Sequence, residues 1–286
     1  MNALADLCQR AFHDVRFEEY ETLISHIAGI TPPLEQHLFS PCGPVIQYWD
    51  HNPDEQVQKL LGATEAKCTE NKIGWEFFDD ARARDFLRHE LGTEYLQAYQ
   101  HCIHAAQRSD FFRYCYLYLN GGMWLDADLV LVASPAPLIG QTVPVFLQRP
   151  THGGITNWFL ATPARHPLFA QLLEVCLRNL ADESHRAQCA EQRDILTSTG
   201  VVAINRVVAR YAHDHLRKKN QQQQPFFVID HDLHDRFIMQ GGEWLGQELA
   251  YKKDHRAWQR WCAEAPHNPL DPSRQEQLRR STDGAD

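Results

Sequence analysis

Two aspartates in the middle of this sequence are the first candidates for chemistry. Asp126 and Asp128 are two residues apart and follow directly on the apolar run Met123-Trp124-Leu125. In extended backbone, residues two apart project to the same side, so this spacing predicts two carboxylates facing one site at the tip of a strand. Carboxylate oxygens suit a hard divalent cation such as Mg²⁺ or Mn²⁺, and such a cation could also hold a diphosphate.

The residues that precede this acidic tip predict the elements that position it. Asp110 and Arg113 are three apart in a segment with helical spacing, so they are expected on one helix face. Asn120-Gly121-Gly122 then ends the helix, because glycine readily takes the left-handed conformation. Helix, glycine cap, buried strand and acidic tip form half of a βαβ unit, with ligand groups at the strand's carboxyl end. The plainest alternative is an ordinary salt bridge on a helix, followed by two aspartates that bracket a loop.

The same residues resemble the core signature of DXD-type retaining glycosyltransferases. The resemblance rests on Ser109-Asp110-Phe111-Phe112-Arg113-Tyr114, Tyr118, Gly121-Gly122 and Trp124-Leu125-Asp126-Ala127-Asp128. The most similar family holds the Och1-like mannosyltransferases and capsular polysaccharide transferases, and is related to the catalytic domains of clostridial glucosylating toxins. An isolated Asp-x-Asp arises by chance in many proteins, whereas the whole ordered constellation is specific.

This resemblance implies an α/β fold, namely a GT-A-like Rossmann-type nucleotide-sugar-binding domain with additional helices at its N- and C-terminal ends. We expect the domain over residues 41–265, after a helical extension at 1–40 and before a polar tail at 266–286. The implied function is metal-dependent transfer of a hexose from a UDP- or GDP-sugar to a glycan, lipid or protein acceptor, with retention of the anomeric configuration. The implied cofactor is Mn²⁺ or Mg²⁺.

The resemblance also assigns catalytic roles to four residues. Asp128 is expected to hold the divalent cation. Asp126 is expected to contact the ribose or the transferred sugar, directly or through a metal-bound water, and so also belongs to the metal site. Asp110 would accept hydrogen bonds from sugar hydroxyls, and Arg113 would orient that carboxylate or bond the donor.

Three further residues are assigned to the donor site. Trp49 ends the predicted strand Val45-Ile46-Gln47-Tyr48-Trp49 and is a candidate for stacking on the nucleotide base, although a core tryptophan explains it equally well. Asn157 resembles a family asparagine beside the sugar, with a buried structural amide as the alternative. Trp124, inside the matched motif, is assigned to the donor as well.

The carboxyl-terminal part of the site is less well specified by the sequence. Relatives have a histidine and a Gly-Ser-Trp element there, and this chain has Tyr251-Lys252-Lys253-Asp254-His255-Arg256-Ala257-Trp258 without Gly-Ser-Trp. His255 is a candidate third metal ligand, or a contact to phosphate, and a surface histidine is the alternative. Lys252 or Lys253 is a candidate to neutralise the diphosphate.

Two rival functions follow from other features. A cluster of ionisable residues after a predicted strand could ligate a metal in a phosphohydrolase, or simply form a solvated turn. Its members are Asp230, His231, Asp232, His234 and Asp235. The second rival is a catalytically idle sugar-nucleotide-binding protein on the same fold.

The composition narrows the class of protein. A chain of 286 residues with 43% hydrophobic and 23% charged residues is an ordinary globular chain. Its formal net charge of −9 disfavours nucleic acid as a partner. We expect no transmembrane segment, since no run of about 18 apolar residues occurs. Eight scattered cysteines without a C-x-x-C pair predict reduced, buried thiols. Together with a polar, acidic N-terminal stretch, they predict a cytoplasmic protein, with non-classical secretion left open.

Hydrophobic patterning predicts the remaining elements. Strands are expected at 73–78, 129–132, 143–148 and 226–230, and helices at 54–61, 168–180 and 201–216.

Overall fold

A six-stranded mixed sheet forms the centre of the molecule. The computed structural model describes residues 43–148, 154–217, 225–253 and 257–264. The sheet has the strand order β2-β1-β3-β6-β5-β7. Its strands are β1 (Val45–Tyr48), β2 (Trp75–Phe78), β3 (Gly122–Leu125), β5 (Val145–Gln148), β6 (Ile155–Thr162) and β7 (Phe227–Ile229). The expected α/β class is therefore confirmed.

Strand directions decide where a site can form. Strand β1 runs parallel to β2 and β3, so the carboxyl ends of these three strands meet at one edge of the sheet. Strand β6 is antiparallel to both β3 and β5, and β7 is parallel to β5. In α/β sheets, ligands bind outside the carboxyl ends of parallel strands. The edge that follows β1 and β3 is therefore the place to look for a ligand.

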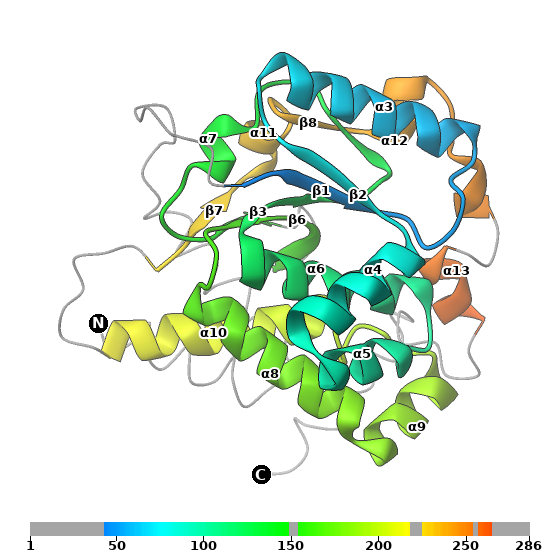
Figure 1. Ribbon diagram of the computed structural model, residues 1–286, viewed down its shortest axis with the longest axis vertical. Coiled ribbons are helices and arrows are strands. Elements are labelled where there is room, and N and C mark those ends of the chain that lie inside the picture. Colours follow the sequence, from blue (N-terminus) through cyan, green and yellow to red (C-terminus); the bar gives the residue numbers. More distant parts are fainter. Residues whose placement is uncertain (1–42, 149–153, 218–224, 254–256, 265–286) are drawn as a thin grey trace, which may run out of the picture.

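Helices cover both faces of this sheet (Figure 1). Helix α3 (Glu55–Glu70) lies on one side, together with α12 (Gly241–Leu245) and a second, two-stranded sheet. That sheet consists of β4 (Leu129–Leu131) and β8 (Ile238–Gln240). The helices on the other side include α6 (Ala105–Asn120), α8 (Pro167–Ala181) and α10 (Val201–Arg217). The remaining helical elements are α4 (Asp80–Phe86), a π-helical turn (Leu87–Leu91), α5 (Thr93–Gln100), α7 (Ala136–Ile139), α9 (Glu183–Gln192), α11 (His231–His234), the 3₁₀ turn η3 (Ala250–Lys253) and α13 (Trp258–Ala263).

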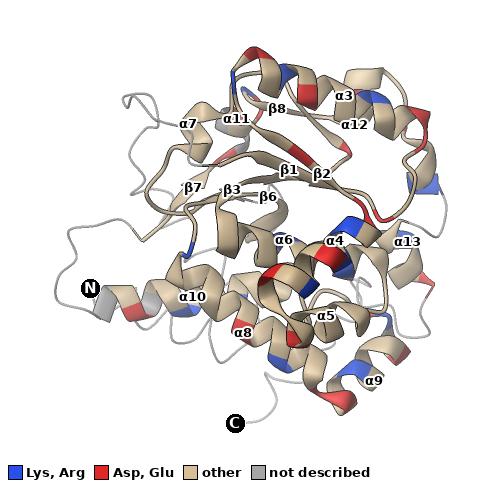
Figure 2. Ribbon diagram, viewed as in Figure 1, with Lys and Arg blue, Asp and Glu red and all other residues tan. Residues whose placement is uncertain are grey.

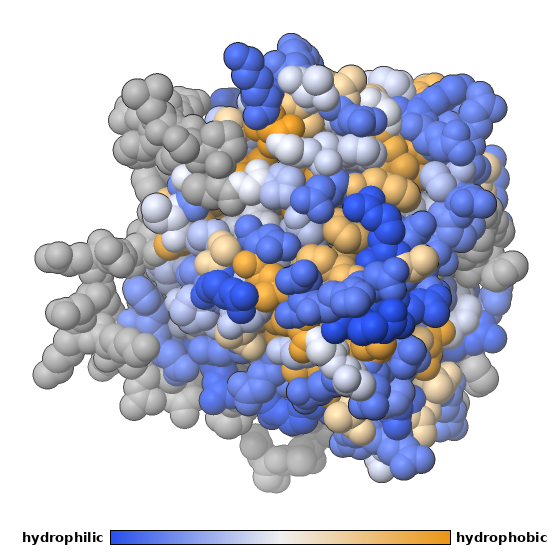
Figure 3. All heavy atoms as spheres, viewed as in Figure 1, coloured by the Kyte–Doolittle hydropathy of each residue, from blue (hydrophilic) through white to orange (hydrophobic). Residues whose placement is uncertain are grey.

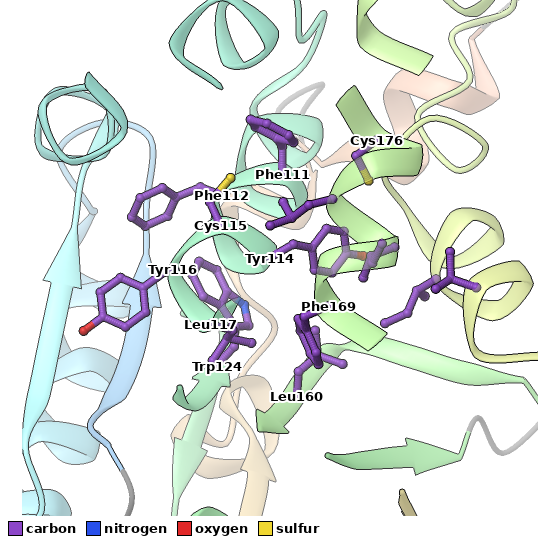
Figure 4. Close-up of a cluster of buried hydrophobic side chains, with 14 of the residues drawn as sticks. Phe111, Phe112, Tyr114, Cys115, Tyr116, Leu117, Trp124, Leu160, Phe169 and Cys176 are labelled. Carbon is purple, nitrogen blue, oxygen red and sulfur yellow. The ribbon is translucent and has the colours of Figure 1, made fainter. Parts of the chain in front are cut away.

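Strand β3 is buried on both faces, which explains its continuous apolar sequence. Trp124 packs on the side of α6 and α8, among aromatic residues that include Phe112, as the close-up in Figure 4 shows. Met123 and Leu125 point to the opposite side and belong to a separate core cluster there. Because successive side chains of a strand point to opposite faces, these three residues contribute to two separate core clusters.

The glycine pair before β3 is required by geometry. Gly121 caps α6 at φ 67°, as the sequence predicts, and its amide donates to the carbonyl of Leu117. Gly122 has φ 102°, and a Cβ there would lie 2.4 Å from the carbonyl oxygen of Pro44. Only glycine lets β3 approach the start of β1 so closely.

The expected extended backbone through Asp126 and Asp128 is wrong. The amide of Leu129 donates to the carbonyl of Asp126 at 3.0 Å, so these residues form a turn between β3 and β4. Strand β4 then leaves the central sheet and pairs with β8. The expected strand at 129–132 exists, but the two aspartates meet through a turn and not through the pleat of a strand.

The outside of the molecule is largely polar. Lys, Arg, Asp and Glu lie mainly on the covering helices and seldom on the strands (Figure 2), and the face in Figure 3 is mostly hydrophilic with apolar areas between. Trp244 is the one large hydrophobic residue marked as exposed among the described residues. No helix within the described ranges has the length and apolar character needed to cross a membrane.

Several sequence-based expectations fall partly or wholly outside the described residues. They are the helical extension at 1–40, the polar tail at 266–286, and the role of His255. The six cysteines within the described ranges are free and buried, as expected.

Candidate functional site

A cavity of about 840 Å³ opens at the carboxyl ends of β1 and β3. This volume falls within the range of small-molecule and cofactor sites, roughly 300–1,000 Å³. Its wall combines residues from the end of β1, helix α6, the β3–β4 turn, strand β6 and the 3₁₀ turn η3. Those with polar or aromatic groups suited to a nucleotide sugar are Trp49, Asp110, Arg113, Asp126, Asp128, Asn157, Tyr251 and Lys252. The sequence assigned eight residues to the site. Six of them line this cavity, namely Trp49, Asp110, Arg113, Asp126, Asp128 and Asn157.

Arg113 joins the helix to the acidic turn. Its guanidinium lies 3.1 Å from Asp110 and 3.0 Å from Asp126. It also donates to Ser109 Oγ at 3.0 Å and to the backbone carbonyl of Asn157. Its Cζ lies 4.9 Å from the ring centroid of Trp124. The predicted ion pair on the helix thus exists, and through Arg113 it extends to Asp126 in the β3–β4 turn.

Asp110 is buried, and each of its carboxylate oxygens accepts a hydrogen bond. Its Oδ1 accepts from Asn157 Nδ2 at 2.8 Å, and its Oδ2 accepts from Thr199 Oγ1 at 3.5 Å. Burial raises the pKa of this carboxyl to about 7, although the nearby Arg113 acts in the opposite direction. Asp110 therefore changes its charge near neutral pH, at the wall of the cavity.

The carboxylate of Asp126 is held in place by Trp124 and Arg113. Its Oδ1 accepts from the indole Nε1 of Trp124 at 2.8 Å as well as from Arg113. Burial raises the pKa of this carboxyl, Arg113 lowers it, and the neighbouring Asp128 raises it, which shows that the two aspartates are close enough to interact.

The assignment of Trp124 to donor contact needs correction. Its side chain is fully buried and does not line the cavity. The reason is the alternation of β3, which turns Trp124 into the core beneath the site. The residue orients Asp126 and has no surface to offer a ligand.

Asp128 is held by residues from the far end of the chain. Its Oδ2 accepts from the hydroxyl of Tyr251 at 2.8 Å and lies 2.8 Å from Lys252 Nζ. Lys253 instead pairs with Glu248 at 3.2 Å and does not line the cavity. The sequence offered both lysines as candidates and gave no role to Tyr251, because no local pattern links residues 123 positions apart.

Trp49 lies half-buried at the cavity wall, directly after β1. The rings of Trp49 and Tyr251 pack edge to face, with their centroids 4.9 Å apart and an angle of 85° between the ring planes. Its indole Nε1 is buried and has no hydrogen-bond partner within the described ranges. The residue therefore combines a packed side with a side that faces the cavity, and its stacking on a base stays a prediction.

The donor set fits a divalent cation that is shared with a substrate. Protein contacts use Oδ1 of Asp126 and Oδ2 of Asp128. In the described part of the chain, no contact to the second oxygen of either carboxylate is recorded. Mg²⁺ is commonly bound by one or two carboxylates together with substrate phosphates, and not by a complete protein cage. Consistent with this, the described ranges contain no group of three or more His, Cys, Asp or Glu that could hold a metal alone.

The described side chains of the cluster at 230–235 form no group of three that could hold a metal. His234 is buried and its ring stacks against Trp158, with centroids 6.1 Å apart at 13°. The side chain of Asp235, its hydrogen-bond partner, is 69% exposed. Of the cluster's described side chains, those of Asp230, Asp232, His234 and Asp235 do not line the cavity. The segment ends strand β7 and begins helix α11, and the buried His234 departs from the solvated turn that was the alternative.

Comparison with known families agrees with this geometry. Residues 46–144 match the family model described as a glycosyltransferase sugar-binding region containing a DXD motif. The matched segment contains Trp49, Asp110, Arg113, Asp126 and Asp128, whereas Asn157 and the η3 residues lie beyond it.

Two curated relatives share part of the chain. An uncharacterised glycosyltransferase of Acanthamoeba polyphaga mimivirus is 28% identical over 119 residues, which are 40% of this chain and 47% of the relative. Inositol phosphoceramide mannosyltransferase 1 of Schizosaccharomyces pombe is 25% identical over 138 residues, which are 46% of this chain and 41% of the relative. The chain therefore matches less than half the length of either relative.

Among solved structures, the PaToxG glycosyltransferase is similar with a TM-score of 0.48 and 16% identity, over 84% of this chain and 91% of that one. A glycosyltransferase involved in glycosylating the major capsid of PBCV-1 is similar with a TM-score of 0.36 and 13% identity, over 76% and 98% of the two chains.

Proposed function

We propose that this protein is a metal-dependent glycosyltransferase that moves a hexose from a UDP- or GDP-sugar to a glycan, lipid or protein acceptor, with retention of configuration. The observation that carries the proposal is the chain of contacts from Asp110 through Arg113 to Asp126, with Asp128 beside it at the cavity wall. The family match over residues 46–144 supports the sugar-binding part, and the relative named as a mannosyltransferase supports a hexose.

The leaving group of such a transfer is a nucleoside diphosphate, and negative charge develops on a phosphate oxygen as it departs. Asp126 and Asp128 would hold Mn²⁺ or Mg²⁺, which supplies a Lewis acid for that charge. Arg113 keeps Asp126 in place through a contact of 3.0 Å, and Trp124 does so through a hydrogen bond of 2.8 Å. Both contacts are preorganised in the protein, so the aspartate needs no rearrangement when the donor binds.

Asp110 and Asn157 are suited to hold the transferred sugar. Both line the cavity and are joined by a hydrogen bond of 2.8 Å, which orients the carboxylate. An ionised Asp110 accepts from sugar hydroxyls, and the Asn157 side chain offers an amide oxygen as a further acceptor. The relatives of this family imply no enzymic nucleophile, and Asp110 is assigned to positioning of the sugar.

The first experiment measures binding of UDP and GDP by calorimetry, with Mn²⁺ and with EDTA. We expect one nucleotide to bind well only with Mn²⁺, and Asp128→Asn to weaken that binding by at least about tenfold, the equivalent of roughly 1.4 kcal/mol. Asp235→Asn is the matched control, because it removes an exposed carboxylate outside the cavity. Equal affinity of wild type and Asp128→Asn would remove the aspartate from the metal site and refute the proposal.

The rivals are distinguished by turnover. A phosphohydrolase would release phosphate without an acceptor, a transferase would release nucleoside diphosphate faster when an acceptor is present, and an idle binding protein would do neither. The described side chains at 230–235 lie outside the cavity, which favours the transferase over the first rival.

A further inference from the structure

Asp126 is paired with Arg113, and Asp128 is paired with Lys252. The side chains of the two cations differ in how freely they can move. Arg113 is buried and is held by Ser109, Asn157 and Asp110 in addition to Asp126. Arg113 is therefore a fixed part of the wall.

Lys252 is the other cation. Its side chain is 40% exposed, and its ammonium lies 2.8 Å from Asp128. Among the described residues, its other contact is the ring of Tyr251, with the ammonium 5.9 Å from the centroid. A lysine ammonium on a flexible four-carbon stem changes position at low cost. Lys252 can therefore leave Asp128 for another partner, whereas Arg113 is held in place.

The charges at this wall favour such an exchange. Asp110, when ionised, and the two aspartates of the acidic turn face Arg113 and Lys252, so this group of five side chains carries one net negative charge. A divalent cation reverses the sign of that sum and prepares the wall for a diphosphate. The same cation repels the ammonium at Asp128 and competes with it for the carboxylate. A phosphate oxygen then becomes the favourable partner for Lys252.

Tyr251 keeps Asp128 oriented while the exchange takes place. Its hydroxyl donates to the same Oδ2 of Asp128, and burial together with the carboxylate raises the pKa of Tyr251, so it stays a donor. Its ring also packs on Trp49 at 4.9 Å. The carboxylate therefore does not depend on the lysine for its position.

We propose that Lys252 is an exchangeable counter-ion: it neutralises Asp128 when no divalent cation is bound, and turns to the diphosphate when one is. The inference rests on the proposed function, because it requires a divalent cation at Asp128 beside a nucleoside diphosphate. Lys253 takes no part, since its partner is Glu248 and it lies outside the cavity wall.

The test exploits two effects of opposite sign. Mn²⁺ alone is titrated into the protein, and free Mn²⁺ is followed by electron paramagnetic resonance. Lys252→Met should bind Mn²⁺ about threefold more tightly than wild type, because a competing, partly exposed ion pair is lost. UDP and GDP are then titrated at saturating Mn²⁺, where the lysine is expected on the diphosphate, and the nucleotide preferred by the wild type should bind about threefold more weakly to Lys252→Met. Lys253→Met, which removes the same charge one position away, should change neither affinity.

A merely structural lysine would not produce this pair of results. Unchanged or weaker Mn²⁺ binding by Lys252→Met would overturn the inference, and so would equal effects of Lys252→Met and Lys253→Met. The proposed function is judged separately by Asp128→Asn. If that variant loses metal-dependent nucleotide binding while Lys252→Met behaves as wild type, only the counter-ion role fails. If Asp128→Asn binds as wild type does, the proposed function itself fails.

Discussion

Asp110 is the residue whose chemistry depends most on its surroundings. It stands on a helix beside a guanidinium, and an exposed aspartate in that position would ionise far below neutral pH. Burial overrides the guanidinium and raises its pKa to about 7. The sequence predicted Arg113 as a neighbour and assigned Asn157 to the same sugar. It did not predict the burial, because burial depends on how α6 packs between β6 and the residues before α10. The contact from Thr199 was missed for the same reason.

This ionisation predicts how sugar binding depends on pH. A sugar hydroxyl donates to the ionised carboxylate, and that form increases as pH rises through about 7. Affinity for the nucleotide sugar, divided by affinity for the matching nucleoside diphosphate, should therefore rise between pH 6 and pH 8. Calorimetry of both ligands with Mn²⁺ measures the ratio, and the diphosphate supplies the control for pH effects on the metal.

Asp110→Asn should remove this dependence and reduce transfer by at least about tenfold, since a lost hydrogen bond to a charged group costs roughly 1.5–3 kcal/mol. A ratio that rises with pH in the variant as in the wild type would assign the titration to another group.

At the scale of elements, the sequence predicted most of the framework around the site. The helix with Asp110, its glycine end and the buried strand are all found, because each is encoded by local spacing. Two details were wrong for reasons that local spacing does not contain. Trp124 belongs to the core, which the period of β3 decides, and the aspartates lie in a turn because β4 pairs with a strand more than 100 residues later.

The junction between α6 and β3 predicts a stability difference between two glycines. Gly122→Ala places a Cβ 2.4 Å from the carbonyl oxygen of Pro44 at φ 102°, so strand β3 must shift. We expect a loss of roughly 3 kcal/mol or more in the free energy of unfolding. Gly246→Ala is the control, since φ is 66° but a Cβ there meets nothing within 4 Å. It should cost only about 1–2 kcal/mol.

Urea unfolding followed by circular dichroism gives both values, and similar losses for the two variants would show that the close approach of β3 to β1 is not required. In the folded fraction, Gly122→Ala should also weaken nucleotide binding, because Asp126 follows directly on the displaced strand.

At the scale of the whole molecule, the site depends on segments from almost the entire described chain. Trp49 follows the first strand and Tyr251 lies near the end, yet their rings are in contact and Tyr251 reaches Asp128. The matched family segment ends at residue 144, before Asn157 and η3. Sequence motifs therefore located the part of the site that is contiguous in the chain. The residues of the site that come from the carboxyl-terminal third, Tyr251 and Lys252, could be placed only from the structure.

Because the wall is assembled from distant segments, a bound ligand should stabilise the molecule as a whole. Cys115 in α6 and Cys176 in α8 are fully buried, burial raises the pKa of both thiols, and they should react with iodoacetamide only when the core opens. A ligand that binds only the folded state lowers the open population about hundredfold at 100 times its Kd. The preferred nucleotide with Mn²⁺ should therefore slow alkylation of both cysteines by about that factor, as measured by peptide mass spectrometry. Asp128→Asn, whose affinity is at least about tenfold weaker, should slow alkylation by about tenfold at most under the same conditions. The contradicting outcome is that calorimetry shows the wild type binding the nucleotide while both cysteines still react at an unchanged rate. The core would then open without disturbing the site, and ligand binding would not be coupled to the stability of the core.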